Sequence, residues 1–386
     1  MPTRVTMADV AQQAGVHPTT VSLALRNHPS LPLSTRQRLQ LLAQQMGYRP
    51  DPALRALIAY RKRALPAKDQ PPLAYLTRWD TKWGWKYSSA HADFYAGAMA
   101  RAHELGYNLE HFGLGEPGLS PQRMSAILSA RGITGLVIAS YHPAYDPELN
   151  FDWSKFSAVK IDNSPRELEL HTITNDQRAI SQLAVQRALG AGYRRIGLIM
   201  PRWWDEFMGL AWSAGFLAEQ QRLVMDDRIP ILFFSGPRAI PVSQAPERDR
   251  LVPHALFEKW FRRYRPEVLI SHAPFVRLQL TEMGISVPRD VAFVEISLDQ
   301  PDGRTAGIHE NCRRVGELAV EILAGQLQQN IHGIPQFPTV TLVEGTWHDG
   351  ESLPLRSIRP TRLKTSSGAR RTPKIRRGRP RHSGPR

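Results

Sequence analysis

Residues 5–25, VTMADVAQQAGVHPTTVSLAL, decide the fold of the N-terminal part of the chain. Thr6 followed by Asp9 is a capping-box variant, because a threonine hydroxyl can bond a free amide while an acid occupies the first helical turn. The apolar residues that follow recur at helical spacing and predict a helix that ends at Gly15, a residue suited to the left-handed C-terminal position. Pro18 fits the first turn of a second helix. The predicted inward residues are Met7, Val10, Ala11 and Ala14 in the first helix, and Val21, Ala24 and Leu25 in the second.

A third helix is predicted from Ser34 through Met46, and it stops at Gly47. Its predicted inward residues are Leu39, Leu42, Ala43 and Met46. Two short helices separated by a glycine-containing turn and followed by a packing helix are typical of a helix-turn-helix. In that layout the second helix lies in the major groove of DNA, with its N-terminal residues against the base edges.

Five blocks in this region resemble the signature of the LacI/GalR (lactose-repressor) family of transcriptional regulators, in the family's order and spacing. The blocks are Val5–Ala11, Ala14–Val16, Thr20–Ser22, Thr35–Arg36 and Met46–Pro50. The resemblance implies a helix-turn-helix domain over 1–49 that binds a double-stranded DNA operator. The residues that it places at DNA are Thr6, Met7, His17, Pro18, Thr19, Ser22, Leu23, Arg26, Thr35, Tyr48, Leu54 and Leu57.

Three positions depart from the family pattern. His17 and Pro32 stand where relatives usually have a capping serine, which weakens two predicted phosphate contacts. Leu23 replaces an arginine that many relatives carry. A leucine offers a thymine methyl only apolar contact, whereas arginine can read guanine with two hydrogen bonds. We therefore expect an operator unlike those of the best-known members.

Residues 50–57 match the hinge segment of the family, and 50–72 is predicted to be a hinge helix and linker. In relatives this helix forms on the operator, pairs with its dimer mate and wedges a leucine between base steps. This behaviour is physically consistent with so short a segment. An isolated short helix is marginally stable in water and needs a partner, and an apolar side chain inserted between base steps can kink the duplex. Leu57 has the wedge position, while Leu54 stands where alanine is usual.

The net charge of +15 is concentrated at the two ends of the chain. Residues 1–63 carry a net +7 and residues 356–386 a net +12, which leaves −4 for the middle. Two basic ends on a near-neutral body are typical of a protein whose ends touch a polyanion. The alternative is that the basic tail only keeps the protein soluble.

The C-terminal residues 351–386 form a predicted disordered basic tail, because they lack apolar periodicity and are dense in Pro, Gly, Ser and Arg. Within the tail, residues 376–381 resemble an AT-hook core, which lies in the narrow A·T minor groove. The predicted contacts come from Arg377, Gly378, Arg379 and Pro380. A chance match in an arginine-rich segment is the alternative interpretation.

From residue 73 the pattern changes to apolar runs that alternate with amphipathic helices, which predicts parallel sheets covered by helices. The predicted strands are 73–77, 108–112, 134–139, 158–161, 195–200, 229–234, 267–271, 291–296 and 339–343. The predicted helices are 90–105, 121–130, 176–191, 207–220, 251–264, 275–283 and 309–327. The resemblance implies an α/β periplasmic-binding-protein-like two-lobed domain over 73–350 behind the all-α head. It divides the chain into lobes of about 73–170 plus 302–330 and 171–301 plus 331–350.

Effectors of such folds bind between the lobes, at the carboxyl ends of strands. This rule selects the loops 78–87, 174–176, 202–205 and 298–299, whose aromatic rings and carboxylates suit a sugar. The predicted effector-binding residues are Trp83, Trp85, Tyr87, Asp176, Arg202, Trp203, Asp205 and Asp299. Packing is the alternative for each tryptophan, and a helix N-cap is the alternative for Asp176.

Several classes of protein are disfavoured. The chain has no P-loop, dinucleotide fingerprint, nucleophile elbow or His/Glu metal motif, so we expect no enzyme, no cofactor and no metal site. A single cysteine, Cys312, excludes an internal disulfide. No signal-peptide-like or membrane-spanning run is present, which favours a cytoplasmic protein. The prediction is a homodimeric, effector-controlled repressor; an architectural A·T-rich DNA-binding protein and a cytoplasmic sugar-binding module are the alternatives.

Overall fold

The computed structural model describes residues 5–25, 28, 30–48, 70–79, 81–114, 119–141, 149–235 and 251–356. The DNA contacts predicted for Arg26, Leu54, Leu57, Arg377, Gly378, Arg379 and Pro380 fall outside the described residues. The predicted disordered tail begins too early, because the amides of Glu351 and Ser352 donate to the carbonyls of Gly303 and Arg304 and the Ser352 side chain is buried.

The N-terminal head has the three predicted helices, α1 (Met7–Ala14), α2 (Pro18–Leu25) and α3 (Leu33–Gln45). They enclose a small apolar core of Val10, Ala11, Val21, Ala24, Leu39 and Ala43. The α3 side chain of Gln40 donates to the carbonyl of Ala24 at 2.8 Å, which ties α3 to the end of α2. The predicted inward faces of the three helices are confirmed at these core positions.

Local chemistry sets both ends of α1. The Thr6 hydroxyl accepts from the amide of Asp9 at 3.3 Å, and the Asp9 carboxylate accepts from the amide of Thr6 at 2.7 Å. This reciprocal pair is the capping box expected from the sequence. Hydrogen bonds from Thr6 lower the pKa of the Asp9 carboxyl. Gly15 has a φ of 64°, as predicted for the residue that ends the helix.

The first lobe contains a six-stranded, fully parallel sheet in the order β11-β5-β4-β3-β1-β2. Its strands are β1 (Pro72–Arg78), β2 (Asn108–Gly113), β3 (Gly135–Tyr141), β4 (Ser157–Ile161), β5 (His171–Asn175) and β11 (Val340–Val343). Its helices are α5 (Ser89–Glu104), α6 (Pro121–Ala130) and α13 (Cys312–Gln329), with short turns η2 (Gly84–Tyr87) and η3 (Trp153–Lys155). Residues of α5 and α13 share one apolar core with the sheet, and residues of α6 share another.

Two glycines let α5 and α13 approach closely. A Cβ added at Gly97 would lie 1.9 Å from the carbonyl oxygen of Arg313. One added at Gly316 would lie 1.9 Å from the carbonyl oxygen of Phe94. No side chain fits at either position, so this helix pair depends on glycine.

The second lobe contains a sheet in the order β12-β10-β9-β8-β6-β7, in which only the β10–β12 pair is antiparallel. Its strands are β6 (Ile196–Pro201), β7 (Leu232–Phe234), β8 (Val268–Ser271), β9 (Ala292–Glu295), β10 (Gly307–His309) and β12 (Thr346–His348). Its helices are α7 (Gln177–Gly190), α8 (Arg202–Phe207), α9 (Ala211–Gln220), α11 (His254–Tyr264) and α12 (Ala273–Glu282), with the turn η4 (Met225–Asp227). Residues of α7 and α9 share one core with this sheet, and residues of α11 and α12 share the other.

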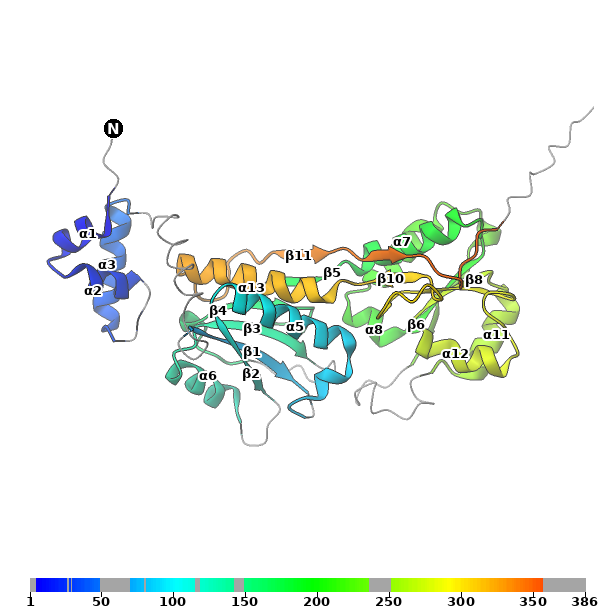
Figure 1. Ribbon diagram of the computed structural model, residues 1–386, viewed down its shortest axis with the longest axis horizontal. Coiled ribbons are helices and arrows are strands. Elements are labelled where there is room, and N and C mark those ends of the chain that lie inside the picture. The colour runs from blue at the N-terminus through cyan, green and yellow to red at the C-terminus, as the bar shows by residue number, and fades with distance from the viewer. Residues whose placement is uncertain are drawn as a thin grey trace, which may run out of the picture.

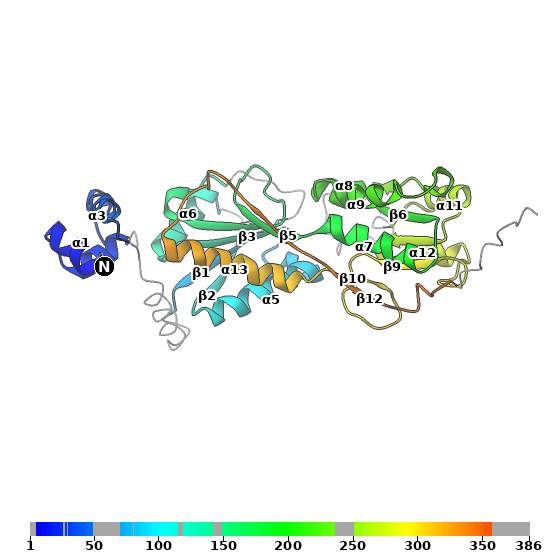
Figure 2. The ribbon, with the colours of Figure 1, turned by 90° about the horizontal axis from the view of Figure 1, so that it is seen from above.

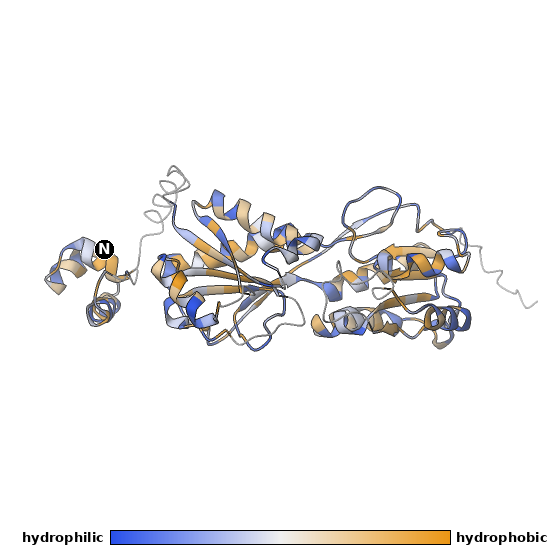
Figure 3. Ribbon diagram, turned by 90° about the horizontal axis from the view of Figure 1, so that it is seen from below, coloured by the Kyte–Doolittle hydropathy of each residue, from blue (hydrophilic) through white to orange (hydrophobic). Residues whose placement is uncertain are grey.

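The two lobes lie side by side along the long axis of the molecule (Figure 1). The chain crosses between the sheets after β5, after β10 and after β11. Figure 2 shows the crossing segments from above, where β5 leads into α7 and β10 lies beside β12. Many strand residues have the hydrophobic colour in Figure 3, whereas hydrophobic and hydrophilic residues alternate along the helices. Such alternation is expected when each helix buries one face. The predicted two-lobed α/β architecture is confirmed.

The structure corrects several predicted elements. The predicted helix 207–220 is broken by Gly209 and Leu210, which both have positive φ, so α8 and α9 are separate. Segment 202–205, predicted to be a loop, forms most of α8. The strands β5, β10 and β12 had no apolar run long enough to reveal them.

The sheets also divide the chain differently from the predicted lobes. Strands β5 (171–175) and β11 (340–343) belong to the first sheet, whereas β10 (307–309) belongs to the second. The predicted boundaries placed all three on the opposite side. Hydrogen-bond pairing between strands distant in sequence decides this assignment.

Candidate DNA-binding and effector sites

The predicted DNA-facing residues of the head lie outside its core. His17 and Thr19 are exposed at the start of α2, and Pro18, Ser22 and Leu23 are half-buried along it. Thr6, Met7, Thr35 and Tyr48 are likewise exposed or half-buried. These side chains are therefore available to a partner, although the hydroxyl of Thr6 also donates to Asp9 at 2.7 Å.

The first turn of α2 is capped by an imidazole. The Thr19 amide donates to Nδ1 of His17 at 3.3 Å, and the Thr19 hydroxyl oxygen lies 2.9 Å from the same nitrogen. His17 stands where relatives usually have a capping serine, and here its ring nitrogen supplies a cap. The weaker phosphate contact expected at this position stays a prediction. Pro32, by contrast, makes no side-chain cap at α3.

A polar cluster lies where the two sheets meet, at the ends of β4, β8 and β9 and after β10. We call it the interlobe cluster; its members are Asp162, His272, Glu295, Ser297, Asp299 and Glu310. The Ser297 hydroxyl donates to Glu310 at 2.7 Å, and Nδ1 of His272 lies 3.0 Å from Glu295. The cluster follows the rule that functional groups gather at the carboxyl ends of parallel strands.

Burial raises the pKa of two carboxyl groups in this cluster, those of Asp162 and Glu310. It raises the pKa of Asp162 to about 6, although the Thr174 hydroxyl donates to the carboxylate at 2.7 Å. Burial also raises the pKa of Glu310 to about 7, and the nearby Asp162 carboxylate adds to that rise. Burial alone would lower the pKa of the His272 imidazole, but the carboxylates of Glu295, Asp299 and Glu310 together outweigh it and the net shift is upward.

Hydrogen bonds from Ser89, Asn163 and Arg166 bridge the lobes around this cluster, beside one from the Asn175 amide to the carbonyl of Glu310. Ser89 at the start of α5 donates to Asp299 at 2.6 Å. The Asn163 amide donates to the carbonyl of Phe207 at 3.2 Å, and the Arg166 guanidinium donates to the carbonyl of Glu206 at 2.8 Å. Asn163 and Arg166 thus donate to carbonyls at the C-terminal end of α8, where a helix carries partial negative charge. The loop after β4, which carries Asn163 and Arg166, is fixed from below its surface by Lys160. The buried Lys160 ammonium donates to the carbonyls of Pro165 and Leu168, at 3.0 and 2.9 Å.

The structure separates the predicted effector residues. Asp299 lies in the interlobe cluster, where it accepts from Ser89. Trp85 is 1% exposed and packs on Tyr75 and Tyr95, so it is a core residue of the first lobe and the prediction for it is wrong. Asp205 is also 1% exposed, and it accepts from the amide of Ser213 in the first turns of α9. This bond joins α8 to α9, and the effector role of Asp205 stays a prediction.

The other predicted effector residues are more accessible. Trp83 is 45% exposed and stacks on His111 at 4.4 Å, with the Lys86 ammonium 4.1 Å from its ring. Tyr87 is exposed, Trp203 is half-buried, and Arg202 lies over the ring of Phe233 at 4.3 Å. Asp176 accepts from the amide of Ala179 at 2.8 Å, which is the alternative N-cap role.

Sequence reasoning missed most of the interlobe cluster. Asp162 directly follows strand β4, so the strand-end rule could have selected it. Glu295 ends strand β9 and Ser297 follows it, so the same rule could have selected both. Glu310 had no signal, because it was assigned to a helix that begins two residues later, at Cys312.

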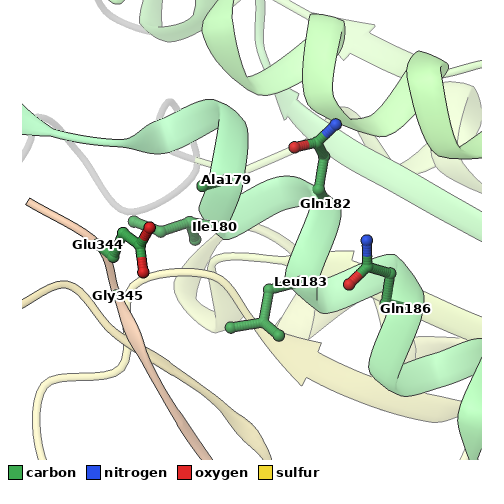
Figure 4. Close-up of a pocket in the computed structure, with 7 residues that line it drawn as sticks. All are labelled: Ala179, Ile180, Gln182, Leu183, Gln186, Glu344 and Gly345. Atoms are coloured by element: carbon green, nitrogen blue, oxygen red, sulfur yellow. The ribbon is translucent and has the colours of Figure 1, made fainter. Parts of the chain in front are cut away.

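A separate hollow of about 220 Å³ lies beside the crossing after β11 (Figure 4). Its wall comes from α7 and from the crossing segment, and it is lined by Ala179, Ile180, Gln182, Leu183, Gln186, Glu344 and Gly345. None of these residues belongs to the predicted effector set or to the interlobe cluster. Within the described residues no group of three His, Cys, Asp or Glu side chains could hold a metal ion. In the same ranges no helix is both long and apolar enough to cross a membrane.

Comparison with known proteins agrees with this architecture. Residues 6–51 match the family described as bacterial regulatory proteins, lacI family. The HTH-type transcriptional regulator Rv3575c of Mycobacterium tuberculosis is 29% identical over 201 residues, which cover 52% of this chain and 53% of the relative. The HTH-type transcriptional regulator IpsA of Corynebacterium glutamicum is 29% identical over 201 residues, with coverage of 51% and 52%. The chain thus spans about half the length of the curated relatives that it matches.

Solved structures show the same fold at low sequence identity. The transcriptional regulator CelR–cellobiose complex has a TM-score of 0.54 at 16% identity and covers 90% of this chain and 100% of that one. The lac repressor dimer bound to operator and the anti-inducer ONPF has a TM-score of 0.51 at 17% identity, with coverage of 91% and 99%. The head, over residues 6–51, therefore matches the lacI family of bacterial regulatory proteins, and the two-lobed domain behind it has the same fold as these solved structures.

Proposed function

We propose that this protein is a sequence-specific DNA-binding transcriptional regulator whose operator affinity is controlled by a small molecule bound between the lobes. The observation that carries the proposal is the match of residues 6–51 to the lacI family, in a chain whose remainder folds as two bridged lobes. We further propose that it acts as a repressor, as a homodimer on a pseudo-palindromic site, in the cytoplasm and without enzymatic activity or a cofactor.

The head supports this function through α2. A helix-turn-helix reads base edges with the N-terminal residues of its second helix. Here these are Pro18 and Thr19, and Leu23 follows further along the same helix; Pro18 and Leu23 are apolar. Such groups favour contact with thymine methyls over hydrogen bonds to guanine. We therefore propose an operator half-site with thymine at the contacted positions.

The interlobe cluster supports control by a ligand. Its carboxylates and the Ser297 hydroxyl offer the hydrogen-bonding groups that the hydroxyls of a sugar require, and the exposed Trp83 offers a ring face. The hydrogen bonds that bridge the lobes connect two bodies that a ligand can hold together or separate. A ligand moves this equilibrium only by its different affinity for the two arrangements. The cellobiose in the CelR complex and the operator in the lac repressor structure are consistent with both proposed partners.

The outer face of the second lobe supports a dimer. Leu256 on α11 and Leu278 on α12 are 40% and 42% exposed on neighbouring helices. Apolar side chains of this size are suited to burial against a second copy, since a twofold interface places the same patch on both subunits.

The test is selection of bound sequences from a random DNA pool, with the full chain and with a chain that ends at residue 355. Enrichment of one pseudo-palindrome by both proteins supports the proposal, and the selected operator then serves to screen sugars for release. Enrichment of only A·T-rich DNA by the full chain, and of nothing by the shorter one, would favour an architectural DNA-binding protein instead.

A further inference from the structure

The outer edge of strand β11 is available for pairing with another strand. Among the described residues β11 (Val340–Val343) pairs only with β5, at the end of the first sheet. The carbonyls of Thr339 and Val343 accept from amides in and directly after β5, at 2.8 and 2.9 Å. Successive residues of a strand turn their backbone groups to opposite sides, so those of Val340 and Leu342 face away from β5. They form an edge of main-chain donors and acceptors that a second strand can pair with.

Apolar side chains are exposed along the same edge. Phe337 is 77% exposed, Val340 is 64% exposed and Leu342 is 48% exposed. Residues 331–343 contain no Lys, Arg, Asp or Glu, and β11 itself contains no proline. Proteins usually protect an edge strand with charges, prolines or bulges, and exposed apolar patches often mark a contact with another protein. We call Phe337, Val340 and Leu342 the edge patch.

The hollow of about 220 Å³ lies farther along this edge, beside Gly345 (Figure 4). Ala179, Ile180 and Leu183 of α7 give it an apolar wall. A Cβ added at Gly345 would lie 2.8 Å from the Ile180 side chain, so position 345 faces that wall. An apolar cavity of about 150 Å³ holds a benzene ring. The hollow therefore has room for a phenyl group.

The edge patch and the hollow have matched positions about Thr341. Phe337 precedes Thr341 by four residues, and Gly345 follows it by four. If two copies of β11 pair antiparallel about a twofold axis at Thr341, each Val340 lies opposite Leu342 of the other copy. The same register places each Phe337 opposite Gly345 of the other copy. Residues directly opposite each other share one face of a sheet, so each phenyl ring is directed toward the hollow of the other copy.

We propose that the β11 edges of two copies pair in this register, with each Phe337 seated in the hollow of the other copy. An uncharged edge suits a second copy, because a twofold contact places the same patch on both chains and like charges would repel. In Figure 1 β11 lies along the upper side of the molecule, whereas α11 and α12 lie on its lower side. The contact is therefore separate from the proposed dimer face. Both contacts together join two dimers into a tetramer whose heads can hold two operators at once, a consequence that rests on the proposed function.

A cysteine at the proposed axis tests the register in the full chain. Thr341 lies opposite its own duplicate in a pair without mutual backbone hydrogen bonds, where the two Cα atoms are about 4.5 Å apart and a disulfide can form. Thr341→Cys should therefore give disulfide-linked pairs of chains under mild oxidation. Thr339→Cys, also on this edge, is the matched control, because its two copies would lie about 13 Å apart along the strands and should link far more slowly. The native Cys312 is 5% exposed and should not react.

Sedimentation equilibrium measures the assembly and its strength. The native chain should form tetramers, and Val340→Lys should leave dimers, because a lysine on an edge strand opposes pairing. Val224→Lys is the matched control, since Val224 in the second lobe is 67% exposed and lies away from the edge patch, and it should keep the native mass. Phe337→Ala should raise the Kd of the tetramer at least about tenfold, through the loss of a buried aromatic ring from each hollow.

Three results would overturn the inference. They are a native chain that stays dimeric at the highest soluble concentration, a native mass in Val340→Lys, and equal cross-linking of Thr341→Cys and Thr339→Cys. Failure of the proposed function gives a different result. If the chain selects no DNA, the masses and cross-links still test the β11 contact. If the proposed dimer face does not form, the β11 contact alone gives a dimer that Val340→Lys converts to a monomer, which supports the inference.

Discussion

The bonds that bridge the lobes should set the balance between closed and open arrangements. We would replace Ser89 and Asn163 with alanine, singly and together, since their side chains donate to Asp299 and to the carbonyl of Phe207 across the interface. A net hydrogen bond contributes about 1 kcal/mol, which corresponds to about a fivefold change in an equilibrium constant. If the two contributions add, the closed-to-open ratio should fall by about 25-fold in the double variant.

Single-molecule FRET measures these populations directly. Cysteines for the dyes can replace Gln122 on α6 and Arg262 on α11, which are exposed in different lobes. The native Cys312 is 5% exposed, and burial raises the pKa of its thiol, so it should escape labelling. We expect a low-FRET population to grow in each single variant and to dominate in the double one.

A matched control tests the loss of a serine hydrogen bond inside one lobe. Ser154 donates to Asp152 at 2.6 Å, the same distance as for Ser89 and Asp299, but both partners lie in the first lobe. Ser154→Ala should leave the FRET distribution unchanged. An unchanged distribution in the Ser89/Asn163 double variant would refute the reasoning, because these bonds would then not restrain the lobes.

Three further changes test the packing, the titration and the capping described above. Gly316→Ala should lower the free energy of unfolding by more than about 2 kcal/mol in chemical denaturation, because the added Cβ would lie 1.9 Å from the Phe94 carbonyl oxygen. Gly325→Ala in the same helix is the control, since its Cβ would meet open space and should be neutral or stabilising. Equal effects of the two substitutions would contradict the packing argument. The folded-state pKa of Asp162 is raised to about 6 from 3.8, so the folded chain holds its proton more tightly; its contribution to stability is therefore lost as the pH rises from about 4 to 6. Asp162→Asn should raise stability at pH 8 by on the order of 1–2 kcal/mol and flatten this pH dependence in denaturant titrations, and an unchanged profile would argue against a buried carboxylate. Thr6→Ala should cost the head about 1 kcal/mol and speed hydrogen exchange in the first turn of α1, whereas native exchange rates would show that the capping box is dispensable.

The head shows how far local sequence signals reach. Its three helices, the Thr6 cap and the Gly15 terminus follow from contacts within a few residues, and the structure confirms each of them. The imidazole cap by His17 was not foreseen, because the sequence was compared with a pattern in which serine has that role. The chemistry of one ring nitrogen two residues before the capped amide could have suggested it.

The lobes show where such signals end. The periodicity predicted most strands and helices, since burial of one helix face or of a whole strand leaves a regular apolar pattern. It did not reveal the short strand β10 or the threonine-rich strand β5, because pairing with neighbours and not apolar content keeps them in their sheets. The division of the chain into lobes depended on these strands.

The sequence by itself determined the class of the protein, the order of its parts and the faces that its helices bury, because these depend on spacing along the chain. The tertiary structure alone decided which groups meet between the lobes. Asp162, His272 and Glu310 lie far apart in sequence, and only the crossing of the sheets brings their charges together. It also decided that Trp85 and Asp205 are buried, since exposure depends on every element packed around a side chain and not on the loop that carries it.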